Sequence, residues 1–220
     1  MTTMEAIQKR HSVRHYNEQD VESDTLTVLQ AEIDECNVES GLNIRLVVND
    51  PDTFNGLLAK VRFTGAKNYI VLAGKESADL EEKAGYYGER VVLKAQQLGL
   101  NTCWAMMFNG KKYATKLSSG EKIVIIIAVG YGMTQGVKRK SKPMESLCKV
   151  DGEMPDWFRS GMEAGMLAPT SLNKQRFLIT LSGNTVKAES KGSGAMSLID
   201  LGIVKYHFEI GAGNKNFSWS

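Results

Sequence analysis

The chain has 220 residues, of which 42% are hydrophobic and 24% are charged, and its formal net charge is +2. This length allows a substantial core in one large domain or two small ones, and the composition is ordinary for a globular protein. The small net charge excludes a global polyelectrolyte. Nucleic acid or an anionic membrane would therefore have to be bound by a local patch.

The sequence offers no pattern of secretion or membrane insertion. The first residues lack the apolar core of a signal peptide, and the longest apolar run, 123–129, is too short to span a bilayer. The three cysteines, Cys36, Cys103 and Cys148, are scattered and have no metal-ligand spacing. We therefore expect a cytoplasmic protein with reduced thiols, no disulfide and no zinc site.

The first part of the chain alternates between helical and extended patterns. Leu26, Leu29 and Ile33 have the spacing of a buried helix face, whereas 43–49 alternates and is rich in β-branched residues. The strongest helical pattern, at 78–98, carries a stripe of mostly small residues that suits close approach by another helix. In chain order, we predict helices at 3–9 and 23–36, a strand at 43–49, a short helix from Pro51, a strand at 69–73, a helix at 78–98 and a strand at 123–129.

The composition changes at 151–153, which is typical of a linker. Pro155 favours the start of a helix, and strands at 177–181 and 185–188 flank a hairpin turn. The pattern of a capping box at 197–200 predicts the start of the last helix, in which His207 is interpreted as structural.

The order of these elements predicts an α+β fold with one mixed sheet wrapped by helices. We expect residues 1–150 and 151–220 to be two halves of one compact unit. An internal duplication would relate them, with 78–98 and 198–212 as the central helices of the two halves.

Cationic side chains cluster near the N-terminus, in a stretch that includes Lys9, Arg10, His11 and Arg14. Because side chains alternate along an extended chain, Arg10, Ser12 and Arg14 would lie on one side of it. Arginine offers a planar fork of donors that suits phosphate, and serine adds a hydroxyl. The stretch therefore predicts a phosphate pocket; the alternative is a solvated basic helix end.

A second polar stretch, 168–175, lies between a predicted helix and a predicted strand. Pro169 stops the helix, and the following residues supply two hydroxyls, two amides and an ammonium group. Such groups can hydrogen-bond a polar planar ligand or its polyol tail. The alternative is an ordinary helix-to-strand turn.

Together, the two stretches resemble the signatures of the FMN-dependent nitroreductase family. Residues 10–14 are similar to its Arg-Arg-Ser-x-Arg motif, and 168–175 to its Ala-Pro-Ser-x-x-Asn-x-Gln-Pro motif. Residues 98–104 and 129–132 resemble two further family segments. Because the second motif lies in the second half of the chain, the sequence resembles a shorter, rearranged branch whose single chain imitates the usual intertwined dimer.

The resemblance implies a nitroreductase-like fold, one FMN per chain and hydride transfer from NAD(P)H, through the flavin, to a small organic acceptor. It implies no catalytic side chain, because the flavin carries the difficult step. Lys67 would reach the pyrimidine edge of the flavin, unless it is a solvated loop lysine. His11 would contact the flavin through its backbone. Phosphate ligands would be Arg10, Ser12 and Arg14, with Arg139 or Lys140; contacts to the ribityl chain and ring would be Pro169, Thr170, Ser171 and Asn173.

Two other functions stay open. Met106 and Met107 stand where glycines often line the flavin, so the chain could bind FMN without nicotinamide turnover, as a flavin store or redox sensor. The basic run 138–142 could bind nucleic acid, but it has neither aromatic partners nor a recognition helix. We therefore expect a small-molecule substrate and neither nucleic acid nor membrane as a partner. The protein would be a monomeric pseudo-dimer or a homodimer.

Overall fold

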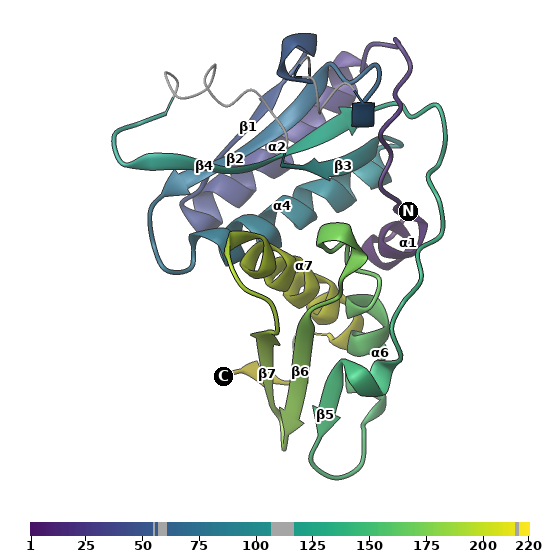
Figure 1. Cartoon of the computed structure of the whole chain (residues 1–220), viewed down its shortest axis with the longest axis vertical. Coiled ribbons are helices and arrows are strands. Elements are labelled where there is room, and N and C mark those ends of the chain that lie inside the picture. Colours follow the sequence, from purple (N-terminus) through teal and green to yellow (C-terminus); the bar gives the residue numbers. More distant parts are fainter. Residues whose placement is uncertain (55, 57–60, 107–116, 214–215) are drawn as a thin grey trace. The chain divides into compact units, whose positions relative to one another are not determined.

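The computed structural model describes residues 1–54, 56, 61–106, 117–213 and 216–220 (Figure 1). These residues form an α+β structure, which confirms the predicted fold class. None of the helices within them is both long and apolar enough to cross a bilayer.

The chain divides into two compact units. Unit 1 comprises Met1–Gln8, Glu81–Glu89 and Arg139–Ser220, and unit 2 comprises Lys9–Leu80 and Arg90–Lys138. The expected halves, 1–150 and 151–220, were defined by a suspected internal duplication and not by spatial contacts. The division of the chain into these two halves stays a prediction.

Unit 2 is built on an antiparallel sheet with the strand order β1-β2-β4-β3. Alternate residues of β2 and β4, such as Tyr69, Val71 and Ile126, point to one face of this sheet, where they pack with Phe54 and Phe63. The elements of the unit are α2 (Ser23–Ser40), β1 (Asn43–Val47), the 3₁₀ helix η1 (Pro51–Phe54), β2 (Asn68–Lys75), the second half of α4 (Leu80–Gln97), β3 (Asn101–Ala105) and β4 (Glu121–Gly130).

Unit 1 contains a second sheet, with the order β5-β6-β7-β8. Its strands are β5 (Cys148–Val150), β6 (Phe177–Ser182), β7 (Thr185–Ser190) and β8 (Ser218–Trp219). Strands β6 and β7 form the predicted hairpin, whereas β5 and β8 add to it in parallel. The described residues therefore form two four-stranded sheets instead of one. Strand β4 is hydrogen-bonded on both sides, by β2 and β3, and β6 is hydrogen-bonded on both sides, by β5 and β7. These two strands therefore cannot pair with each other.

Two helices approach closely inside unit 1. The helices of this unit are α1 (Thr3–Lys9), the first half of α4, α6 (Asp156–Gly165) and α7 (Ala195–Ala212). A Cβ atom on Gly202 of α7 would lie 2.0 Å from the carbonyl oxygen of Glu82, and one on Gly85 would lie 2.1 Å from that of Ile199. Only glycine permits such backbone contact. A helix therefore does approach α4 closely, as predicted, but the contact is made at Gly85, which lies outside the predicted stripe of Ala84, Gly88, Val91, Ala95 and Leu98.

The last helix begins earlier than predicted. It starts at Ala195, directly after Gly194, whose φ of 79° breaks the preceding chain. Ser197 therefore lies inside the first turn, and its hydroxyl donates to the carbonyl oxygen of Ser193 at 3.2 Å. The prediction of a capping box at 197–200 is wrong, and the Asp200 carboxylate bonds another segment of the chain.

A fully buried polar pair links α4 and α7 within unit 1. The Nε2 atom of His207 lies 2.9 Å from Glu89 Oε1, and its Nδ1 atom lies 3.1 Å from the carbonyl oxygen of Ala164. Both side chains of the pair are 0% exposed. His207 is therefore a structural residue, as interpreted from the sequence.

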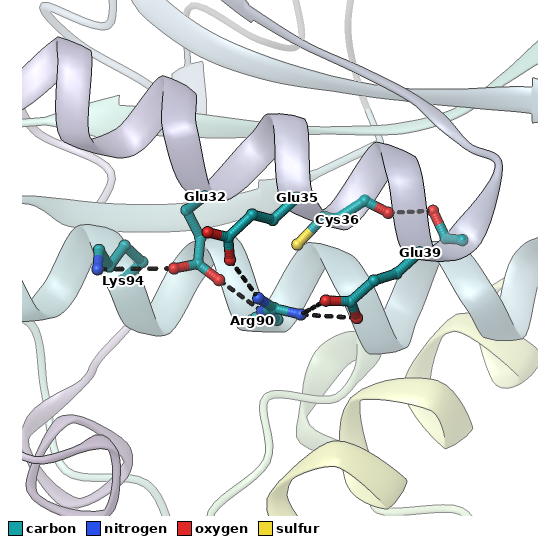
Figure 2. Close-up of polar contacts among 7 residues, drawn as sticks. Glu32, Glu35, Cys36, Glu39, Arg90 and Lys94 are labelled. Carbon is teal, nitrogen blue, oxygen red and sulfur yellow. Dashed lines mark hydrogen bonds and ion pairs between the residues drawn. The ribbon is translucent and has the colours of Figure 1, made fainter.

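A second polar cluster, within unit 2, joins α2 to the second half of α4 (Figure 2). The Arg90 guanidinium lies 2.5 Å from Glu32, 2.9 Å from Glu35 and 2.8 Å from Glu39. Burial raises the pKa of the neighbouring Cys36 thiol to about 12. Because partly exposed ion pairs contribute little each, we interpret this cluster as a structural link between two helices.

Candidate functional site

The cationic stretch near the N-terminus is extended and pairs with other segments of unit 2. Ser12 forms a parallel bridge with Thr102 of β3, whose carbonyl oxygen accepts from the backbone N–H of Val13 at 3.0 Å. The backbone N–H of Tyr16 donates to the carbonyl oxygen of Thr64 at 2.9 Å. Main-chain hydrogen bonds therefore fix the register of this stretch.

The three side chains predicted to lie on one side of this stretch, Arg10, Ser12 and Arg14, all affect the pKa of the Cys103 thiol. Burial raises the pKa of this thiol, whereas the cations of Arg14 and Arg10 and a hydrogen bond with Ser12 oppose the rise. Arg10 is 1% exposed, but Arg14 is open to solvent. All three groups are near enough to Cys103 to influence its thiol, and their shared side of the chain stays a prediction.

Two glycines lie against the main chain and the first side-chain carbon of this stretch. A Cβ atom on Gly136 would lie 2.6 Å from that of His11, and one on Gly65 would lie 2.2 Å from the carbonyl oxygen of Tyr16. Both glycines have positive φ, 77° and 69°. The stretch therefore packs closely against the backbone at Gly65 and Gly136, a contact that we call the backbone cradle. Larger residues at these two positions would push the segments apart.

Lys67 is engaged by other residues of unit 2. Its ammonium group donates to Asp20 Oδ1 at 2.6 Å and to the carbonyl oxygen of Glu18 at 2.7 Å. It borders a cavity of about 660 Å³, whose lining residues are Glu18, Pro51, Phe54, Phe63, Thr64, Gly65, Ala66 and Lys67. Two of the three ammonium donors are used by these partners, and a contact between Lys67 and a flavin stays a prediction.

The second stretch forms a strained turn in unit 1, which we call the motif turn (Thr170–Gln175). It contains the 3₁₀ helix η3 (Ser171–Asn173). Leu172, Asn173 and Gln175 have φ values of 53°, 54° and 45°, in the left-handed region that non-glycine residues avoid. Each such residue costs on the order of 1 kcal/mol, so the surrounding contacts must hold the turn in place.

One support of the motif turn is Asp200, on α7. Both of its carboxylate oxygens accept from the backbone N–H of Ser171, at 2.9 and 3.0 Å. Burial raises the pKa of Asp200 to about 6, although the hydrogen bond from Ser171 works in the opposite direction. The capping-box pattern predicted a different role for this carboxylate, so its bonds to the turn were not predicted.

The other support is Gln175, which is 3% exposed and joins the turn to the basic loop (Arg139–Lys142). Its Nε2 atom donates to the carbonyl oxygen of Lys140 at 2.9 Å, and its Oε1 atom accepts from the backbone N–H of Lys142 at 2.9 Å. Asn173 Nδ2 donates to the same Lys140 oxygen at 2.8 Å. Asn173 and Lys140, both predicted site residues, are therefore neighbours.

The two units carry different parts of the predicted site. The residues in unit 2 are Arg10, His11, Ser12, Arg14 and Lys67, and those in unit 1 are Arg139, Lys140, Pro169, Thr170, Ser171 and Asn173. The His11 Nδ1 atom lies 2.9 Å from the carbonyl oxygen of Lys9, so its ring is turned toward its own chain. Met106 is 61% exposed, whereas Met107 lies outside the described residues.

Comparison with known proteins gives a family and a fold. A family model described as "Putative TM nitroreductase" matches residues 2–212. Among solved structures, a "putative nitroreductase" of Thermotoga maritima superposes with a TM-score of 0.67, at 23% identity, over 96% of this chain and 83% of its own. No curated protein matches the sequence.

Two further structures share the fold. A "putative nitroreductase in complex with FMN" from Desulfovibrio desulfuricans has a TM-score of 0.53 and 19% identity, covering 70% of this chain and 98% of its own. A "putative NADH dehydrogenase/NAD(P)H nitroreductase" from Bacteroides thetaiotaomicron also has a TM-score of 0.53, at 20% identity, covering 66% and 95%. At such identities the likeness extends to the fold alone.

Proposed function

Because the chain belongs to the nitroreductase family that this model describes, we propose that it is an FMN-dependent oxidoreductase. In this proposal it transfers hydride from NAD(P)H to a small organic acceptor. The observation that carries the proposal is the extended stretch with Arg10, Ser12 and Arg14, which is fixed beside Thr102 of β3 by main-chain pairing and would offer two cations and a hydroxyl to a phosphate group. The FMN bound in the relative from Desulfovibrio desulfuricans supports it.

The cationic stretch fits the phosphate end of FMN. A phosphate dianion removed from water needs at least two cations and further hydrogen-bond donors. Arg10 and Arg14 would supply the charges, and Ser12 would supply a hydroxyl. His11 would add a backbone contact from the same rigid stretch.

The motif turn and the basic loop fit the remainder of the cofactor. Pro169, Thr170, Ser171 and Asn173 would line the ribityl chain and the ring edge. The exposed ammonium group of Lys140 would add positive charge, with Arg139 beside it in the chain. Lys67 would face the pyrimidine edge.

When bound, FMN would supply the redox chemistry, by accepting hydride from a nicotinamide and passing it to an acceptor in a ping-pong cycle. The residues of this chain would bind and orient the cofactor, and we assign none of them as acid or base. One cofactor per chain is the expected ratio.

The first experiment tests the phosphate contacts. Titration of cofactor-free protein, followed by flavin fluorescence, should give a much lower Kd for FMN than for riboflavin, which lacks the phosphate. Arg14→Gln should raise the FMN Kd about tenfold to a hundredfold and leave riboflavin unchanged, because one charged hydrogen-bond donor is lost. Arg62→Gln, at another exposed arginine of unit 2, is the matched control and should change neither Kd. Equal affinities for FMN and riboflavin would contradict the phosphate assignment.

The second experiment tests turnover. Under anaerobic conditions, NADH or NADPH should bleach the flavin absorbance in a stopped-flow instrument, and a quinone or nitroaromatic should restore it. Bound FMN that neither nucleotide bleaches would instead indicate a flavin store or redox sensor. A colourless protein that ignores added FMN would reject both functions.

A further inference from the structure

Gln175 connects two segments that are more than 30 residues apart in the sequence. On the side of the basic loop it bonds the main chain of Lys140 and Lys142, through its side-chain donor and acceptor. On the side of the motif turn, its Nε2 atom donates to Asn173 Oδ1 at 3.1 Å, and its own backbone N–H donates to Thr170 Oγ1 at 3.0 Å. A single side chain thus bonds both segments.

The chemistry of these bonds requires an amide of this length. The Lys140 carbonyl can only accept and the Lys142 N–H can only donate, so the side chain between them must carry both a donor and an acceptor. Glutamate offers acceptors alone when ionised, and methionine, of similar size, offers no strong hydrogen-bonding group. Asparagine is shorter by one methylene group.

We propose that Gln175 is a positioning residue that fixes the basic loop on the motif turn, so that the two hold a ligand as one body. The proposal rests on the proposed flavin site for what the ligand is, but the coupling between the two segments does not depend on it. Gln175 is buried, and in this proposal it acts through Lys140 and Asn173. The left-handed residues of the turn keep their conformation because this amide and Asp200 bond the main chain around them.

Backbone hydrogen exchange, measured by NMR on the full chain without added flavin, tests the coupling. In the native protein the Lys142 amide should be protected, because it donates to Gln175. Gln175→Met keeps the side-chain volume and should speed the exchange of this amide about tenfold, since the Lys142 N–H loses its acceptor, while the bond from Asn173 Nδ2 to the Lys140 oxygen remains. Lys174→Met, the same replacement at the exposed neighbouring position, should leave its exchange unchanged. Unchanged exchange in Gln175→Met would overturn the proposal.

Gln175→Glu separates positioning from general stability and serves if Gln175→Met does not fold. It keeps an acceptor for the Lys142 N–H but loses the donor to Lys140. Exchange at Lys142 should therefore return toward the native rate, while the Kd for FMN stays about tenfold above the native value. Gln175→Met should raise the Kd at least as much. Faster exchange with an unchanged Kd would reject the positioning role. If the native protein binds no FMN while exchange responds as described, the proposed function fails and the coupling stands.

Discussion

The two predicted halves of the site are held in place in different ways. In unit 2, the stretch around Ser12 is fixed by main-chain pairing and by glycines that leave no room for a Cβ atom. In unit 1, the motif turn is fixed by the side chains of Gln175 and Asp200. The difference teaches where substitutions act: on the cationic stretch they change the surface offered to a ligand, whereas on the motif turn they change the structure as well.

The largest effect should come from filling the backbone cradle in unit 2. Gly65→Ala should lower the free energy of unfolding by about 3 kcal/mol, because the new methyl group would overlap the Tyr16 carbonyl oxygen and the residue would keep a positive φ. Gly41→Ala is the control, since Gly41 also has positive φ but nothing within 4 Å of its Cβ position; about 1 kcal/mol is expected. Urea denaturation measures the unfolding free energy of both variants. Equal losses would show that the backbone around Gly65 shifts to make room for the methyl group.

A smaller effect, of opposite sign, is expected at Asp200. Its pKa rises from 3.8 to about 6 on folding, so the folded chain holds a proton that the unfolded chain releases between these pH values. The resulting stability is complete below pH 4 and is lost as the pH rises through 6. Above pH 6 the buried carboxylate costs up to about 3 kcal/mol, at about 1.4 kcal/mol for each pKa unit, and Asp200→Asn should restore part of this stability.

The measurement for this carboxylate is the unfolding free energy at two pH values. Asp200→Asn should stabilise the protein at pH 7.5 and have no effect at pH 4, because the native carboxyl is then protonated. Asp151→Asn, at an exposed aspartate of the same unit, should change stability at neither pH. Destabilisation at pH 7.5 would mean that the ionised form is essential to the turn.

Variants at Thr170 test how much a side-chain hydrogen bond stabilises the motif turn. Thr170→Val keeps the shape but removes the hydroxyl that accepts from the Gln175 N–H at 3.0 Å. Leaving that buried donor without a partner should cost about 1–2 kcal/mol. Thr170→Ser keeps the hydroxyl and should cost less than half as much. If Val and Ser variants unfold at the same urea concentration, this bond does not support the turn.

The smallest effect on stability is expected at Arg14. Its side chain is exposed, and its main-chain oxygen accepts from the Thr64 N–H whatever the side chain is. Arg14→Gln should therefore change the unfolding free energy by less than about 0.5 kcal/mol. A larger loss would show that side chains also hold the cationic stretch and would remove the contrast between the two halves.

Features set by local periodicity were predictable from the sequence. The stripe on 78–98 predicted α4, and the apolar run at 123–129 predicted β4. In each case the residues that decide the structure lie within a few positions of one another. Strand β3 was not predicted because its five residues, Asn-Thr-Cys-Trp-Ala, carry little of the β-branched or uniformly apolar pattern that identified β1 and β4.

The supports of the motif turn could not be read from local patterns. Gln175 bonds Lys140 and Lys142, which lie 35 and 33 residues earlier, and Asp200 bonds Ser171, 29 residues earlier. The acidic residue at 200 also fitted a capping box, and only the start of α7 at Ala195 shows that it does not serve as one. The separation into two sheets likewise depends on strand pairing between distant segments.

The buried contact between His207 and Glu89 has a consequence for protons in the core of unit 1. A carbonyl oxygen can only accept, so the Nδ1 atom beside Ala164 must carry a hydrogen. The Nε2 atom lies 2.9 Å from the Glu89 carboxylate, so the ring is held on both sides. The Nδ1 proton is sealed from water, so its imidazole resonance should persist in NMR spectra long after transfer to D₂O. The exchange rate of this buried proton therefore measures how often the contact between α4 and α7 opens.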